Sequence, residues 1–523
     1  MNDIQPHLGG AKETSGAKRT FHITLFGNYG GRYQERAELK EQPLTKNNWD
    51  QLFDIMDPQW MGTVQLPKVE DLRLVLHFKS LKDFDEKGLI NAVPFLKALK
   101  ELKGRVEACN KENSLVPAGL VQSEPELIRL RDMAAAQKES KVVNLLDMID
   151  IGEEEEEEEQ AMRLPNLKNF FAASTYEGDK RGKVAAELDT VSRSVIDQIL
   201  SDSKFVELHG LWRGLKLFVG KSSPNLKVNL VDCMKSELCD ATFLLYVKPE
   251  TQDPRPLDLA IYADYLDNSD DDRHTLLYLG KMAENLSVPM VLNAAPQVFR
   301  AKSYRGLAHI RDFSGKLSTP AHIKWKKLRD EPGSTWLFLA LNPFQVGDPE
   351  LREELQAFAP ASFYIALVMM VHCAVNDWPS ELLGPLGQIA VSPGTAVELT
   401  KDQGDDLAFE GFSAISQLEG REVISLLGMT CFGTIKIPAS DKLDARNLVE
   451  YTLPYRFFAG CCSRELRKFH PDEDLKAALR NYAGLKEDTE IREEKDDEGR
   501  RLLQFRAPFS VLNAFPTLIL AVD

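Results

Sequence analysis

The feature that most restricts how this chain can fold is a run of seven consecutive glutamates at residues 153–159. Adjacent like charges repel one another and cannot enter a core, so the run predicts a solvated linker. It separates a shorter N-terminal part from a longer C-terminal part. The whole chain of 523 residues exceeds what one compact core usually holds, and its length predicts about three domains.

Composition excludes several classes of protein. The net charge of −16 argues against nucleic-acid binding, which needs a basic face. No basic leader with an apolar run follows Met1, so no secretory signal is expected, and no apolar stretch is long enough to predict a membrane span. The odd count of seven cysteines is typical of reduced thiols. Together these features predict a cytoplasmic protein.

Apolar patterning predicts mixed α/β structure. Residues 72–78 alternate between apolar and polar side chains, which is typical of a strand with one buried face, and residues 85–106 carry a helical stripe. Strands alternating with helices such as 275–285 predict an α/β body, and the apolar run at 365–371 predicts a buried helix. The remaining strand candidates are residues 21–26, 226–231, 241–247, 290–293, 336–341, 502–505 and 518–522.

Two other helical segments carry candidate functional or core residues. Leu208, Trp212 and Leu215 share one face of a helix and are expected to anchor the core. Four apolar residues before the glutamate run also share one face, and so short a helix is barely stable alone. It could dock into a partner's groove or pack on its own domain, and the sequence leaves both open. These four residues are Val142, Leu145, Leu146 and Ile149.

Motifs that would indicate catalysis or a cofactor are missing from the sequence. Gly220-Lys221-Ser222 lacks the preceding glycine of a phosphate loop, and no histidine pair or nucleophile motif occurs. The aspartates of residues 264–272 predict a solvated acidic loop because the glycine and glutamate of a calcium loop are absent. Cys461 and Cys462 have no second ligand pair at a zinc spacing and are expected in the core. The sequence therefore predicts no enzyme, cofactor or metal.

Several segments resemble a known family. Residues 78–106 (FKSLKDFDEKGLINAVPFLKALKELKGRV) resemble the small sheath subunit (TssB or VipA type) of bacterial type VI secretion systems. Residues 205–219 (FVELHGLWRGLKLFV), 289–299 (PMVLNAAPQVF) and 447–463 (NLVEYTLPYRFFAGCCS) resemble the large sheath subunit (TssC or VipB type). The chain thus resembles a fusion of two normally separate subunits. It departs from the pattern at Phe344, where the family has arginine.

The resemblance implies a multi-domain contractile-sheath fold with terminal strands free to extend sheets in neighbouring subunits. The expected divisions are a flexible arm (1–19), a small-subunit-like region (20–138), a short helix and linker (139–188) and a large-subunit-like region (189–523). The residues expected in inter-subunit strands are Phe21, Ile23, Leu25, Leu502 and Phe505.

The function implied by the resemblance is mechanical. Such subunits form a helical homopolymer around an inner tube protein, meet baseplate components, and contract to drive the tube into a target. The resemblance also implies an AAA+ disassembly ATPase that would grip the helix containing Leu145. The alternative is a non-contractile scaffold or baseplate-associated protein of the same fold. An enzyme with an unrecognised α/β active site is the third and least favoured class.

Overall fold

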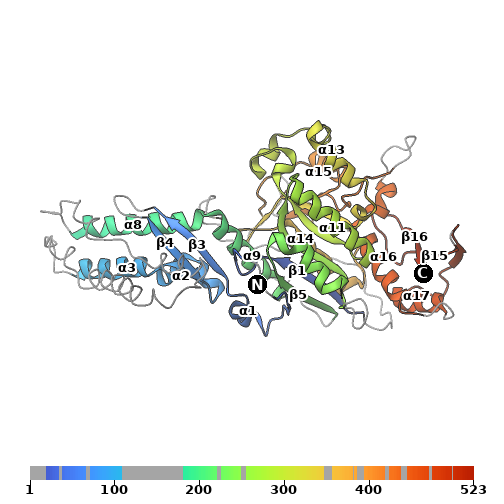
Figure 1. Ribbon diagram of the computed structural model, residues 1–523, viewed down its shortest axis with the longest axis horizontal. Coiled ribbons are helices and arrows are strands. Elements are labelled where there is room, and N and C mark those ends of the chain that lie inside the picture. Colours follow the sequence, from blue (N-terminus) through green and yellow to red (C-terminus); the bar gives the residue numbers. More distant parts are fainter. Residues whose placement is uncertain are drawn as a thin grey trace, which may run out of the picture.

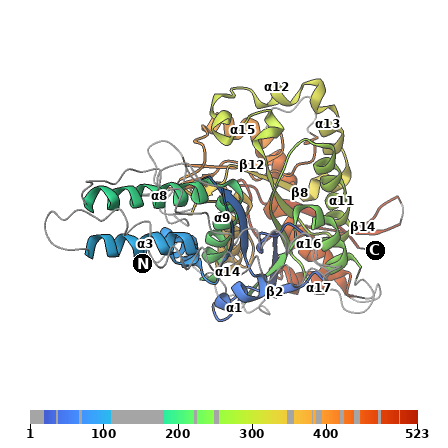
Figure 2. The same ribbon diagram turned by 60° about the vertical axis from the view of Figure 1, so that its left-hand side comes forward.

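The structure is a computed structural model that combines an α/β body with a narrower arm projecting from one side (Figures 1 and 2). Among the residues that it describes, no helix is both long and apolar enough to cross a bilayer. The described residues are 19–34, 38–65, 71–108, 181–220, 225–248, 255–346, 356–380, 382–385, 394–417, 423–436, 445–469, 474–497 and 499–522.

The body is built on a nine-stranded sheet. Its six central strands are parallel, and antiparallel strands form both margins. In spatial order the strands are β11 (Gly384–Pro385), β13 (Ile424–Leu426), β12 (Phe412–Gln417), β8 (Leu337–Leu341), β7 (Met290–Ala294), β6 (Leu259–Leu266), β1 (Phe21–Gly27), β5 (Leu226–Asp232) and β2 (Glu41–Pro43).

Helices cover both faces of this sheet, as a parallel sheet with apolar side chains on each face requires. Successive residues of the central strands belong to different cores: Ile261 faces one and Tyr262 the other. The core on the first face includes α9 (Ser203–Val219), α14 (Ala361–Asn376) and α16 (Leu453–Leu466). The core on the second includes α10 (Leu238–Thr242), α11 (Asp270–Leu286), α12 (Phe313–Leu317), α13 (Ile323–Arg329) and α15 (Lys401–Phe409).

The arm joins segments from both sides of the glutamate run. Its helices α3 (Pro94–Ala108) and α8 (Arg181–Ser201) lie side by side (Figures 1 and 2), and Lys103 Nζ lies 2.7 Å from Asp189 Oδ2 between them. The hairpin of β3 (Gln59–Val64) and β4 (Leu72–His77) and the helix α2 (Glu86–Ala92) complete the arm. The helix α1 (Trp49–Met56) lies where the arm meets the body.

The C-terminal part ends in a separate antiparallel sheet whose middle strand is β15. The helix α17 (Leu475–Ala483) precedes this sheet, and a two-stranded ladder of β9 (Phe344–Gln345) and β10 (Phe358–Ala359) lies beside α9. The three strands of the C-terminal sheet are β14 (Ile491–Lys495), β15 (Arg501–Arg506) and β16 (Thr517–Val522).

The expectation that residues 21–26 and 502–505 are edge strands is wrong. β1, which holds Phe21, Ile23 and Leu25, pairs with β5 on one side and β6 on the other, so both its edges are used within the chain. β15, which holds Leu502 and Phe505, likewise pairs with β14 and β16. Neither strand has a free row of backbone groups to offer a neighbouring molecule.

The expected division into a small-subunit-like and a large-subunit-like region does not separate two folded bodies. β1 and β2 from the first region pair with β5 and β6 from the second, and the expected boundary at residue 189 falls within α8. The two regions therefore share one sheet. The helix of Val142, Leu145, Leu146 and Ile149 lies outside the described residues.

Local predictions had mixed outcomes. The buried helix expected at 365–371 is present as α14, and the strands expected at 72–78, 226–231, 290–293 and 336–341 are present with boundaries shifted by a residue or two. Residues 241–247 are helical rather than extended, passing from α10 into a π-helical turn. There Phe243 and Leu244 are exposed while Leu245 and Tyr246 are buried, so the burial does not alternate as in a strand.

Candidate assembly interface and charged pocket

The C-terminal sheet has two outer strands, β14 and β16. Within the residues that the structure describes, each pairs only with β15, so one edge of each remains open. An open edge carries unpaired N–H and C=O groups and is a template for pairing with another chain. The edges differ in character: β14 reads IREEK, whereas β16 reads TLILAV. The apolar β16 edge is the stronger candidate for assembly.

Side chains fix this sheet against the body. Leu503 and Phe505 of β15 lie opposite Leu520 and Leu518 of β16, and all four are buried. They pack towards α16, where the ring of Phe458 lies 6.2 Å from that of Phe505. The inner face of the sheet is therefore part of the core.

The outer face of the same sheet exposes apolar side chains. Ile519 of β16 is 57% exposed and Phe515, just before it, is 52% exposed. The guanidinium of Arg506 lies 4.7 Å from the centre of the Phe515 ring, a cation–π arrangement. An open strand edge and an exposed apolar face thus occur on one element, and this is the combination that soluble proteins ordinarily avoid.

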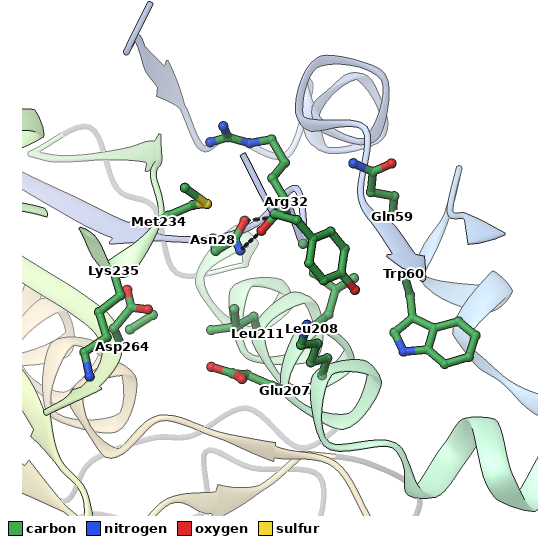
Figure 3. Close-up of a pocket in the computed structure, with 14 residues that line it drawn as sticks. Asn28, Arg32, Gln59, Trp60, Glu207, Leu208, Leu211, Met234, Lys235 and Asp264 are labelled. Atoms are coloured by element: carbon green, nitrogen blue, oxygen red, sulfur yellow. Dashed lines mark hydrogen bonds between the residues drawn. The ribbon is translucent and has the colours of Figure 1, made fainter. Parts of the chain in front are cut away.

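A second candidate site is a pocket of about 230 Å³ at the carboxyl ends of β1, β5 and β6 (Figure 3). β5 and β6 lie on opposite sides of β1, and the chain crosses between them through α10. In open α/β sheets, such a switch in strand order leaves a crevice where ligands bind. The loop after β1 closes one wall, with Gly31 at φ +61° packed against the Gln59 carbonyl.

Two of the pocket's cations are already paired. Arg32 Nε lies 3.1 Å from Asp232 Oδ2, and Lys235 Nζ lies 2.9 Å from Asp272 Oδ2. A third cation, Lys204, lies 4.2 Å from the centre of the Tyr33 ring.

Two carboxylates of the pocket stand out. Asp264 Oδ2 is buried and has no hydrogen-bond partner. Burial, reinforced by the nearby charge of Glu207, raises the pKa of Asp264 to about 7. Glu207 is exposed on α9, and Figure 3 shows it reaching towards the side of the pocket where Asp264 and Lys235 lie. Of the aspartates in residues 264–272, Asp264 lies near the end of β6 and three begin α11, while Asp267 lies in the connection between these elements.

A larger cavity of about 740 Å³ lies at the amino ends of β1 and β6. It is rich in basic residues, but Arg464 Nη2 lies 2.6 Å from Asp258 Oδ1 and Arg467 bonds to the Asn285 carbonyl and Ser287 Oγ. These groups tie α16 to the strand ends and the end of α11, so they serve the packing of the body.

The described residues offer little for catalysis. Burial raises the pKa of Cys233 well above its usual value, and it raises the pKa of Cys431 to about 11, so both thiols stay protonated and poorly nucleophilic. Cys461 and Cys462 are buried on α16. No group of three or more His, Cys, Asp or Glu side chains in this part of the chain is placed to hold a metal ion.

Comparison with protein families gives one match. Residues 250–354 match the VipB family, described as "EvpB/VC_A0108, tail sheath N-terminal domain". This part of the chain is similar to the N-terminal domain of tail sheath proteins. It contains β6, β7 and β8, three of the central parallel strands, together with α11. The match confirms the resemblance to the large sheath subunit. No curated protein is detectably similar in sequence to the chain.

Two solved structures resemble the chain weakly. One is the baseplate of the anti-feeding prophage, with 13% identity, a TM-score of 0.34, and coverage of 59% of this chain and 76% of that chain. The other is the helical sheath of the anti-feeding prophage in its contracted state, with 14% identity, a TM-score of 0.34, and coverage of 59% and 78%.

The segment that matches the tail sheath family contributes to both candidate sites. Its strand β6 supplies Asp264 to the pocket, and the end of α11 contacts α16 through Arg467. The C-terminal sheet packs on α16 in turn. The three expected core anchors lie on α9 and are all buried: Leu208, Trp212 and Leu215.

Proposed function

We propose that the chain is a structural subunit of a contractile sheath that polymerises around an inner tube, as in type VI secretion. The observation that carries the proposal is the match of residues 250–354 to the tail sheath family. The partners in this proposal are further copies of the chain, an inner tube protein, baseplate components and an AAA+ disassembly ATPase. The proposed site of action is the bacterial cytoplasm.

The open edges of the C-terminal sheet support this role. A sheath must lengthen and shorten without separating into rings, and main-chain pairing between subunits gives such continuity. β14 and β16 offer edges for that pairing on opposite sides of β15. In this proposal the C-terminal sheet joins neighbouring subunits while the α/β body forms the wall.

One observation favours the alternative, a non-contractile scaffold or baseplate-associated protein of the same fold. β1 is expected to exchange between subunits if both ends of the chain link the polymer, yet it pairs inside its own chain. A protein joined to its neighbours through the C-terminal sheet alone could assemble without contracting. The two functions are distinguished by one observation, namely whether the assembled particles change length.

The proposal is tested with a pair of matched substitutions. Ile519→Lys places a charge on β16, which is a device that soluble proteins use to block edge pairing. Ile323→Lys is the control, since Ile323 is 55% exposed but lies on α13. We expect Ile519→Lys to lower the amount of polymer seen by electron microscopy and light scattering at least tenfold, and Ile323→Lys to leave it unchanged. Equal polymer from both variants would refute the proposed interface.

A further inference from the structure

The pocket of Figure 3 contains a buried acceptor that nothing in the described chain satisfies. Asp264 Oδ2 is buried and has no hydrogen-bond partner. A buried polar atom without a partner is uncommon and is costly when the group is charged. Asp264 also lines the pocket, so a donor bound in the pocket would lie next to this carboxyl group.

The charges around this atom leave room for one cation. The carboxylates of the pocket and its rim are Asp232, Asp272, Glu207 and Asp264, whereas the cations are Arg32, Lys204 and Lys235. When all four carboxylates are ionised, one negative charge is in excess. The paired cations are held by other carboxylates, so they cannot turn to Asp264 without breaking those contacts.

The walls favour a flat cation over a compact one. Asp264 comes from β6 and Glu207 from α9, and Figure 3 shows both on the same side of the pocket. A guanidinium has five N–H donors in a rigid plane and can bond two carboxylates on different elements, whereas an ammonium is a point charge. Trp60, on the opposite side of the pocket in Figure 3, is buried, and the Tyr33 ring is in contact with Lys204, so the preference for a flat cation rests on the two carboxylates.

We propose that this pocket binds a guanidinium group through Asp264 and Glu207. The group is supplied either by an arginine of a neighbouring copy or by a small guanidinium compound. The first source rests on the proposed function and would place the contact where the arm meets the body. A divalent cation is disfavoured because the described residues do not bring three ligands together here and Lys235 lies beside Asp264.

Binding by this site requires Asp264 to be ionised. The charged groups that act on it are Glu207 from α9, Lys235 after β5 and Asp272 from α11, and the neighbouring hydroxyls of Tyr29 and Tyr265 stay neutral because burial raises the pKa of each. With a pKa of about 7, the ionised fraction of Asp264 rises roughly tenfold between pH 6 and pH 8. Guanidinium binding should strengthen by about the same factor, with release of a proton.

The first test measures the binding of methylguanidinium to the full, unpolymerised chain by calorimetry at pH 6 and pH 8. We expect a dissociation constant on the order of 1 mM at pH 8. Asp264→Asn should weaken binding at least tenfold and Glu207→Gln severalfold, while Asp271→Asn, which changes an exposed carboxylate outside the pocket, should have no effect. Methylammonium should bind severalfold more weakly than methylguanidinium.

Equal binding of the two probes, or unchanged binding by Asp264→Asn, would overturn the inference; so would binding that does not change with pH. A folded Asp264→Asn variant, checked by circular dichroism, is required for each comparison. Glu207→Gln provides an independent variant because its side chain is exposed and its replacement leaves the core intact.

The second test identifies the source of the guanidinium. If it is an arginine of a neighbouring copy, Asp264→Asn lowers the yield of polymer and methylguanidinium competes with assembly. If it is a free compound, the wild-type chain still binds methylguanidinium, and neither Asp264→Asn nor the probe changes the yield of polymer. Binding without any polymer from the wild-type chain would refute the proposed function and leave the pocket standing. Polymer formation without guanidinium binding would refute the pocket proposal and leave the proposed function standing.

Discussion

Replacing Trp212 by alanine should be among the most damaging changes to this fold. The side chain is fully buried, its ring stacks on Phe53 at 4.0 Å between centres, and it meets Trp49 edge-on at 5.6 Å. Removing so large a buried side chain costs about 3–5 kcal/mol through lost contacts and the cavity left behind. The indole Nε1 also donates to the Tyr29 carbonyl at 2.9 Å, and stranding that acceptor adds about 1–3 kcal/mol.

The assay is urea unfolding of the dispersed chain, followed by circular dichroism, with the midpoint and slope compared between variants. Trp212→Phe is the matched control, because it keeps a ring against Phe53 but removes the donor to Tyr29. We expect the alanine variant to lose at least twice as much free energy of unfolding as the phenylalanine variant. A loss below about 1 kcal/mol, or equal losses in both variants, would refute the packing described for α9.

Two further predictions concern buried charge. Burial and the charge of Arg213 lower the pKa of His209 to about 3. Because this folded-state pKa lies below the unfolded value of 6.5, the folded chain loses stability as the pH falls from about 6.5 towards 3. His209→Gln should flatten this loss in thermal melts, and an unchanged pH profile would contradict the assignment. Arg329 and Glu410 form a buried ion pair, so Glu410→Ala should cost about 3–5 kcal/mol in urea unfolding, whereas the double change to Arg329→Met and Glu410→Leu should cost less. A double variant as unstable as the single one would show that the charges are not coupled.

Sequence periodicity predicted the elements of the body where each has a single strong pattern. The uninterrupted apolar residues of α14 and of the strands β7 and β8 are typical of elements buried on both faces, and they occur as expected. Segment 241–247 is also apolar, but it is short, and a short apolar run does not distinguish a strand from a buried helix.

Strand neighbours could not be obtained from periodicity. The FHITLF segment has the composition of any buried strand, and its position between β5 and β6 depends on partners about 200 residues away. The edge strand β14 was missed because its residues IREEK include one apolar side chain, that of Ile491, so no apolar alternation indicates a strand. The pocket was missed for a similar reason, since Asp264 and Glu207 meet only after β6 and α9 pack together.

The resemblance to sheath subunits supplied what periodicity could not. It rested on segments such as residues 289–299, which fall within the family match at 250–354. It also led to an error, because it implied that the N-terminal strand is free to pair with a neighbouring subunit. In this chain β1 instead pairs with β5 on one side and with β6 on the other.

The central claim is that the chain polymerises through the open edges of its C-terminal sheet. The most direct test is electron microscopy of the purified full-length chain at high concentration, with and without an inner tube protein. The account predicts hollow tubes whose density joins the C-terminal sheet of one subunit to a strand of the next. Particles that stay monomeric under every condition, or tubes in which β14 and β16 touch no neighbour, would contradict it.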